Sequence, residues 1–166
     1  FKIPISRFLL LSLTGRIPGQ RFSPPIPAGP DFSENDNRVY AQFIRNALRG
    51  EDIVMKSTGS QFRSWSYVVD CASAILYILL KGKNGEAYNI ADEASNISIR
   101  ELAEITASMV GRKVVMEVPD ETERKGYNPV SKSVYSVEKL KTLGWQPATS
   151  IKDGIRKTIN HLQSKP

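Results

Sequence analysis

The fold of this 166-residue chain is organised around the stretch Gly59-Ser60-Gln61-Phe62-Arg63-Ser64-Trp65-Ser66-Tyr67-Val68-Val69-Asp70. In its middle, Phe62, Ser64 and Ser66 alternate with Gln61, Arg63 and Trp65. This alternation of side chains predicts an extended segment over residues 61–66. We expect this segment to pair back, through a turn at Thr58-Gly59, with a short strand over residues 52–57. Asp70 marks the entrance of a helix. The stretch therefore predicts a hairpin that leads directly into a helix.

Arg63 lies in the middle of this stretch and is the first candidate for a binding residue. Arginine offers a planar fork of donors that matches a phosphate group with two hydrogen bonds. An exposed strand arginine, either solvated or paired with an acid, explains the same residues. From the sequence alone this second interpretation is favoured.

The rest of the chain alternates between short strands and helices. Apolar spacing predicts further helices over residues 38–49, 70–80, 98–110, 137–142 and 151–162, and strands over residues 87–91, 113–118 and 131–135. Ser98 and Glu101 form the pattern of a capping box. This order predicts an α/β fold, a small mixed lobe of short strands and helices.

The helix over residues 70–80 is expected to be buried. Its apolar positions form a wide face, made of Ala72, Ile75, Leu76, Leu79 and Leu80. Cys71 lies within the same pattern and is expected to be a small core residue.

Residues 1–30 differ in character from the remainder. They hold six of the ten prolines, which restrict the backbone and remove hydrogen-bond donors. We expect a strand over residues 3–13 and an irregular loop over residues 16–30. The apolar part of this segment looks like a piece whose partners lie elsewhere, at the junction to a lobe that this chain lacks. Residues 31–166 are then expected to form one lobe.

Composition limits the classes of function. The net charge of +6 favours anionic partners, but the basic residues are scattered, as on a solvated surface. One cysteine and one histidine do not make a structural metal site, and a single thiol fits a reducing, cytoplasmic compartment. The apolar run over residues 8–13 is too short to span a bilayer. Neither a metal nor a membrane is therefore expected as a partner.

No motif for cofactor binding or catalysis stands out. A dinucleotide fold needs a glycine-rich turn between strand and helix, and the chain contains no G-x-G-x-x-G. Tyr-x-x-x-Lys occurs at Tyr77 with Lys81 and at Tyr135 with Lys139. The first pair lies in the apolar helix, and the second crosses a helix start. We expect no catalytic residue and no cofactor site in this chain.

The stretch over residues 61–72 resembles the Q-x-R-D-[FW]-x-Y-V-x-D-x-A pattern of extended short-chain dehydrogenase/reductases that act on nucleotide sugars. These enzymes include dTDP-glucose 4,6-dehydratases, UDP-glucuronate decarboxylases and UDP-galactose 4-epimerases. The resemblance continues in order through Asp36-Asn37-Arg38-Val39 and Gly85-Glu86-Ala87-Tyr88-Asn89-Ile90. It then extends through residues 98–102, 139–147 and 150–155. The chain resembles the C-terminal, substrate-binding lobe of that family.

The resemblance implies specific contacts with a nucleotide-diphosphate sugar. Arg63 and Arg124 would bind the diphosphate, and Asn89 would approach it. Arg38, Val39 and Phe43 would border the nucleobase, with Lys56 on the strand beside it. It also implies that the full enzyme binds NAD in its other lobe, oxidises the sugar transiently at C4 and forms a homodimer, so that this chain alone would be inactive.

Two positions depart from the family pattern. Ser64 stands where the family carries Asp, and Tyr127 stands where several members carry an acid that binds ribose. A competing hypothesis of another class is a non-catalytic basic module that binds nucleic acid or a protein partner. The absence of a basic cluster argues against it, and no nucleic-acid partner is expected.

Overall fold

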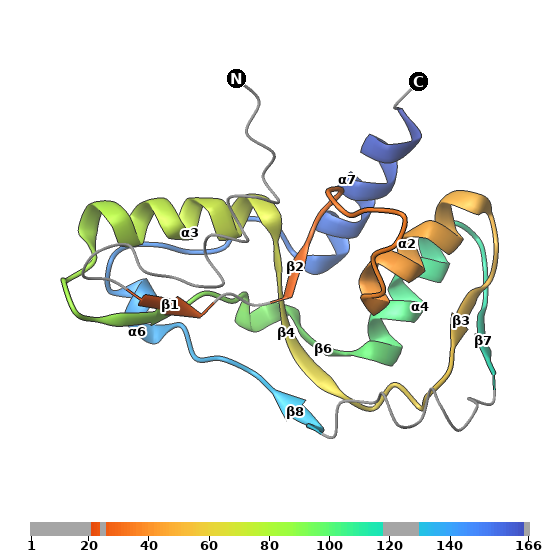
Figure 1. Cartoon of the computed structure of the whole chain (residues 1–166), viewed down its shortest axis with the longest axis horizontal. Helices are drawn as coiled ribbons and strands as arrows, with labels where there is room; N and C mark the ends of the chain where they lie inside the picture. Colours follow the sequence, from red (N-terminus) through yellow and green to blue (C-terminus); the bar gives the residue numbers. More distant parts are fainter. Residues whose placement is uncertain (1–20, 24–25, 118–129, 165–166) are drawn as a thin grey trace.

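The computed structural model describes residues 21–23, 26–117 and 130–164 (Figure 1). Its helices are α2 (Val39–Arg49), α3 (Val68–Lys81), α4 (Ile99–Met109), α6 (Glu138–Lys141) and α7 (Ile151–Gln163), with a 3-10 turn η1 (Glu93–Ser95). Its strands are β1 (Arg21–Ser23), β2 (Ile26–Ala28), β3 (Ile53–Met55), β4 (Phe62–Tyr67), β5 (Ala87–Asn89), β6 (Asn96–Ser98), β7 (Val114–Met116) and β8 (Lys132–Ser133). The α/β class is confirmed.

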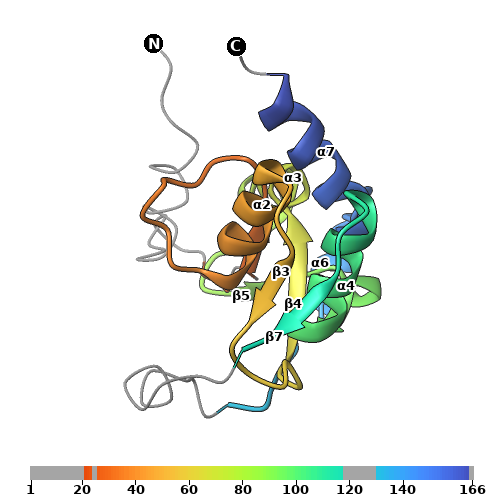
Figure 2. The ribbon, with the colours of Figure 1, turned by 90° about the vertical axis from the view of Figure 1, so that its right-hand side faces the viewer.

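Strand β4 is the centre of the arrangement and runs directly into α3. It pairs in parallel with β2 and β8 and antiparallel with β6. The hairpin prediction is wrong, because β3 pairs with β7 instead, in parallel (Figure 2). The segment between β3 and β4 is held by the start of α4, where Ile99 N donates to Gln61 O and Arg100 N donates to Gly59 O, both at 3.0 Å.

Gly59 is required at this point of the chain. Its φ is +66°, a conformation that side chains rarely adopt, and an added Cβ would lie 2.9 Å from Arg100 N. The turn that replaces the hairpin therefore depends on this glycine.

The prediction of an irregular loop over residues 16–30 is wrong for the part that the structure describes, because that part contains two strands. Strand β1 pairs in parallel with β5, and β2 pairs in parallel with β4. Pro27 is accommodated within β2, because β2 is an edge strand of the β4 sheet in the described part of the chain. The strand predicted over residues 3–13 lies outside the described residues, and the division at residue 30 stays a prediction.

The larger of two hydrophobic clusters, called the main core here, fills the space between β4 and three helices. Helix α2 packs against α4 and α7, and α7 packs on β4. The main core comprises Ala28, Tyr40, Phe43, Ile44, Ala47, Ile53, Met55, Trp65, Leu102, Ala103, Ala107, Ile151, Ile155 and Ile159. Helix α4 begins with the capping box that the sequence predicts, formed by Ser98 and Glu101, and at the start of α7 Ser150 accepts from Asp153 N.

The second cluster, called the small core, lies under α3. It comprises Cys71, Ala74, Ile75, Ile78, Tyr88, Ile90, Ala91, Val137, Leu140 and Trp145. The predicted burial of α3 is therefore only partly correct. Its inward face carries Cys71, Ala74, Ile75 and Ile78, whereas Ala72, Leu76, Leu79 and Leu80 are exposed.

Candidate functional site

Arg63 is buried near the N-terminal end of β4, with 7% of its surface exposed. Its guanidinium donates to Phe62 O (3.0 Å), Gln61 Oε1 (3.1 Å) and Val130 O (2.6 Å). All three acceptors are neutral, and among the described residues no carboxylate forms an ion pair with Arg63. The exposed, acid-paired arginine that the sequence favours is thus not what the structure shows.

Burial of a charge is costly unless a counter-charge or strong hydrogen bonds offset it, and the described residues supply Arg63 with neutral acceptors only. An anion that reaches the guanidinium would supply both the missing charge and further acceptors.

Ser64 shows what replaces the family's acid in this chain. Its hydroxyl donates to Asn96 Oδ1 (2.7 Å) and accepts from Tyr135 N (3.0 Å). It therefore joins β6 to the segment that follows β8. Together, Ser64 and Arg63 hold residues 130–135 against β4, which also pairs with β8 through Phe62 and Arg63.

Arg38 lies at the N-cap of α2 and is half exposed. It forms an ion pair with Asp36 at 2.5 Å, and the same arginine holds the pKa of the Asp36 carboxyl below its ordinary value. Val39 begins the helix and packs against the main core. Asp36 thus fixes the chain before α2 through Arg38 rather than by a side-chain cap.

The other predicted contacts lie in different settings. Phe43 is buried in the main core and 1% exposed, so in this conformation its ring is not accessible to a nucleobase. Lys56 follows β3 and is half-buried, and Asn89 donates to Ser136 O at 3.1 Å from the end of β5. Arg124 and Tyr127 lie outside the described residues. The roles of all these residues in binding stay predictions.

Asp70 is a structural residue whose role could not be assigned from the sequence. It is buried in the first turn of α3, and its carboxylate accepts from Ala148 N (3.2 Å) and Thr149 N (2.9 Å). An acid at a helix start was visible, but its partners lie far along the chain. The same helix holds Cys71, whose burial raises the thiol pKa to about 11, as expected of a core residue rather than a nucleophile.

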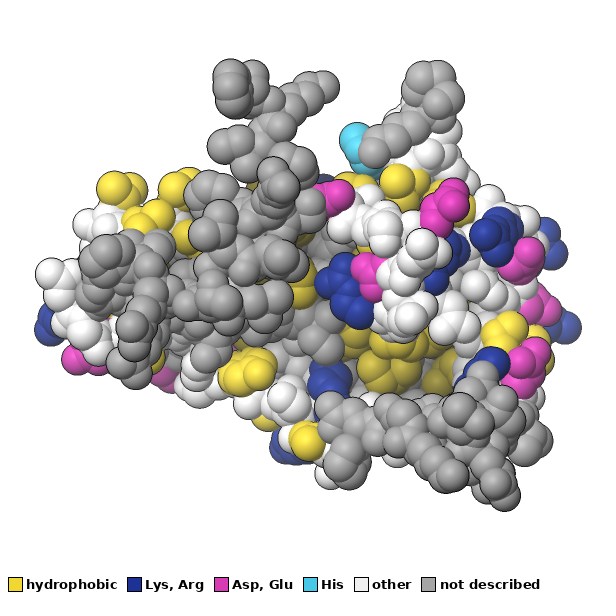
Figure 3. All heavy atoms as spheres, viewed as in Figure 1, with side chains coloured by type: hydrophobic (Ala, Val, Ile, Leu, Met, Phe, Trp, Pro, Cys, Tyr) yellow, Lys and Arg dark blue, Asp and Glu magenta, His cyan; other side chains and the backbone are white. Residues whose placement is uncertain are grey.

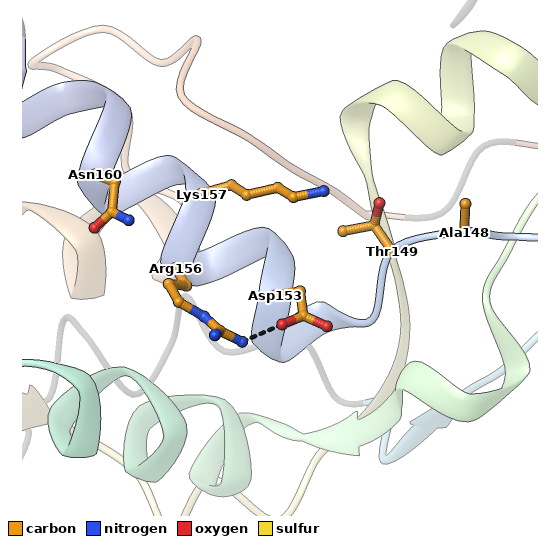
Figure 4. A pocket seen from close by; sticks show the side chains of 6 residues that line it. All are labelled: Ala148, Thr149, Asp153, Arg156, Lys157 and Asn160. Carbon is orange, nitrogen blue, oxygen red and sulfur yellow. Dashed lines mark hydrogen bonds and ion pairs between the residues drawn. The ribbon is translucent and has the colours of Figure 1, made fainter.

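A shallow cavity of about 250 Å³ lies at the start of α7 (Figure 4). It is lined by Ala148, Thr149, Asp153, Arg156, Lys157 and Asn160, none of which is a predicted contact. Arg156 pairs with Asp153, and Lys157 lies 5.6 Å from the centre of the Tyr67 ring. Its cations already have partners, so this cavity is a weaker candidate than Arg63.

Two kinds of feature are missing from the part of the chain that the structure describes. No group of three metal-binding side chains comes together there. Among those same residues, no helix has the length and apolar character needed to cross a bilayer.

Comparison with known proteins assigns the chain to a family. Residues 16–91 match the model of the NAD dependent epimerase/dehydratase family. The chain is 31% identical over 122 residues to dTDP-glucose 4,6-dehydratase 1 of Escherichia coli and 27% identical over 142 residues to UDP-glucuronic acid decarboxylase 1 of Xenopus tropicalis. This chain belongs to the extended short-chain dehydrogenase/reductase family.

A solved structure gives the same assignment. The crystal structure of UDP-glucose 4-epimerase from Thermotoga maritima with UDP-glucose superimposes with a TM-score of 0.73 at 25% identity, over 87% of this chain and 45% of that one. The alignment with the Escherichia coli protein covers 70% of this chain and 33% of that protein. The alignment with the Xenopus protein covers 82% of this chain and 31% of that protein. The chain thus spans less than half the length of these relatives.

The family's name implies NAD as the cofactor, and the residues of this chain do not form a binding turn for it. A dinucleotide diphosphate is cradled by a glycine-rich turn that opens a helix, and the sequence holds no such turn. Among the described helices, α3 and α4 follow directly on strands, and their first turns carry Val68, Val69 and Ile99 rather than glycine. We therefore derive no chemical step through NAD from this chain.

Proposed function

We propose that this chain forms the nucleotide-sugar-binding part of an NAD-dependent epimerase or dehydratase, and that Arg63 binds the diphosphate. The observation that supports the proposal is the buried guanidinium of Arg63, which has only neutral acceptors among the described residues. The relatives whose names specify UDP- or dTDP-sugars point to the same class of ligand.

In this proposal the diphosphate replaces some of the acceptors that Arg63 uses here. Two nitrogens of the fork are engaged: Nη1 donates to Phe62 O, and Nη2 donates to both Gln61 Oε1 and Val130 O. A phosphate offers several negatively charged oxygens, so exchange of a neutral carbonyl for a phosphate oxygen strengthens the hydrogen bond. Arg124, Asn89, Arg38, Val39, Phe43 and Lys56 complete the proposed contacts with the phosphates and the base.

The two halves of the proposed enzyme have different roles. This part holds the nucleotide, while NAD and the groups that oxidise the sugar at C4 belong to the other half of the enzyme. The complete enzyme is proposed to be a cytoplasmic homodimer. The chain alone is then expected to bind nucleotide without turnover.

Thermal unfolding of the isolated chain tests the proposal. UDP or dTDP at about 100 times its Kd should add about 2.7 kcal/mol to the free energy of unfolding. For a domain of this size, that corresponds to a rise in Tm of roughly 5–10 °C. A folded sample whose Tm is unchanged by either nucleotide would contradict the proposed site.

The variant Arg63→Lys separates the guanidinium from its charge. Lysine keeps the charge but loses the fork, so UDP affinity measured by titration calorimetry should fall about tenfold or more. The matched control is Arg45→Lys, because Arg45 also donates to backbone carbonyls, those of Ser33 (3.3 Å) and Asp36 (2.7 Å). Equal losses of affinity in the two variants would assign Arg63 a structural role only.

A further inference from the structure

The side chain of Gln61 contacts the guanidinium of Arg63, the group proposed to bind the diphosphate. Gln61 Oε1 accepts from Arg63 Nη2 at 3.1 Å. Side chains two residues apart along an extended backbone lie on the same face, so the chain places the amide beside the guanidinium. This contact is therefore local in the sequence, unlike the contact of Arg63 with Val130 O.

The backbone that carries Gln61 is held by two other segments. Gln61 O accepts from Ile99 N (3.0 Å) at the start of α4, and Phe62 N donates to Ser131 O (2.8 Å). Gln61 itself is half-buried. A binding group is placed most precisely when the residues that support it are themselves fixed. The Gln61 amide therefore reaches the guanidinium from a fixed starting point.

The three acceptors around Arg63 are of two kinds. Phe62 O and Val130 O are backbone carbonyls, which any residue at those positions supplies. Gln61 Oε1 is the side-chain acceptor that the described residues provide for Arg63. Of these three contacts, the one with Gln61 alone depends on the identity of a side chain.

The neutral amide also distinguishes Arg63 from other cations of the chain. Arg38, Arg156 and Lys139 each form an ion pair with a carboxylate. On the face of the molecule seen in Figure 3, acidic side chains lie beside many of the basic ones. A carboxylate at the position of the Gln61 amide would compete with a phosphate for the guanidinium, whereas an amide oxygen orients the guanidinium and leaves its charge in place.

We propose that Gln61 is a positioning residue for Arg63: its amide oxygen fixes the guanidinium for the diphosphate without neutralising the charge. A guanidinium has five N–H donors, and the described residues accept three hydrogen bonds from that of Arg63. Phosphate oxygens can therefore bind while the contact with Gln61 is kept. The inference rests on the proposed function, because it concerns the residue that binds the diphosphate there.

Two replacements of similar length test this role at pH 7. Gln61→Glu puts a carboxylate beside Arg63, so UDP affinity measured by titration calorimetry should fall about tenfold or more. The free energy of unfolding in urea should not fall, because an ion pair replaces the hydrogen bond. A purely structural residue would instead lose stability and affinity together. Gln61→Met removes the acceptor but adds no charge, and UDP affinity should fall by roughly three- to tenfold.

A double-mutant cycle shows whether Gln61 acts through Arg63. In the Arg63→Lys variant the guanidinium is already absent, so adding Gln61→Met should change UDP affinity by less than about twofold. Independent effects of the two substitutions, which multiply in the double variant, would overturn the positioning role.

The matched control is Gln146→Glu, which adds the same charge at an exposed glutamine between α6 and α7. It should leave UDP affinity unchanged. A loss equal to that of Gln61→Glu would overturn the inference, because net charge would then explain both. UDP binding that Gln61→Glu does not weaken would overturn it too, yet leave the proposed function standing. An unsubstituted chain that binds no UDP would contradict the proposed function, and the inference with it.

Discussion

The main core and the small core are built differently. The main core is enclosed by α2, α4, α7 and β4, and its largest side chains, such as Trp65 and Ile44, are fully buried. The small core has α3 as one wall, and the outer side of that wall is apolar and open. The elements of this chain enclose the first core, whereas the helix that bounds the second leaves apolar side chains exposed on its other side.

The largest expected effect separates the two sides of this comparison. Trp65→Ala removes a fully buried side chain from the main core and should cost about 3–5 kcal/mol of unfolding free energy. Leu80→Ala, on the exposed side of α3, should change it by no more than about 0.5 kcal/mol. Urea denaturation followed by circular dichroism measures both. A cost of several kcal/mol for Leu80→Ala would show that the isolated chain already covers this face.

Asp70 connects the two regions, and its loss should give the next largest effect. It lies in α3, yet its carboxylate accepts from the backbone N–H groups of Ala148 and Thr149, just before α7. Asp70→Ala leaves these donors without that acceptor and should cost about 1.5–3 kcal/mol. Asp70→Asn keeps one acceptor oxygen and should cost less.

The same variant shows whether the two cores unfold together. Trp65 reports on the main core and Trp145 on the small core. Tyrosine replacement of one tryptophan at a time gives each core its own fluorescence signal in urea. With Asp70 present we expect coincident transitions. Asp70→Ala should separate them, with the Trp145 signal lost first. Coincident transitions in Asp70→Ala would mean that other contacts couple the cores.

Local features of this fold were predictable from the sequence, whereas strand partners were not. The capping box at Ser98 depends on a neighbour three residues away, and it was predicted correctly. The pairing of β3 with β7 and of β1 with β5 depends on residues far apart in the chain, and alternation alone does not encode it.

The candidate site shows the same limit. The position of Arg63 on a strand was evident, but its burial follows from Val130 O, which lies 67 residues further along the chain. The exposure of Leu80 had no local signal either, since an apolar residue on a helix looks the same whether its cover is within the chain or outside it. The apolar pattern of a helix therefore does not tell which of its sides the chain itself covers.

The smallest expected effect compares one carboxylate from each region. Glu101 accepts from Ser98 N (2.7 Å) and Ser98 Oγ (2.8 Å) at the start of α4, while Glu86, beside β5, pairs with Lys139. These partners lower both carboxyl pKa values from 4.5. A lowered pKa stabilises the fold above the unfolded value, and that contribution is lost as pH falls from about 4.5 through the folded pKa.

Salt should distinguish the two causes, because ionic screening weakens an exposed ion pair more than local hydrogen bonds to a capping carboxylate. Below pH 4.5, Glu101→Gln should flatten the fall in unfolding free energy at both 0.05 M and 1 M NaCl. Glu86→Gln should flatten it at 0.05 M NaCl only. Urea denaturation across pH 3–6 measures both slopes. An effect of Glu101→Gln that disappears at 1 M NaCl would show that charge, rather than the capping hydrogen bonds, lowers the pKa of Glu101.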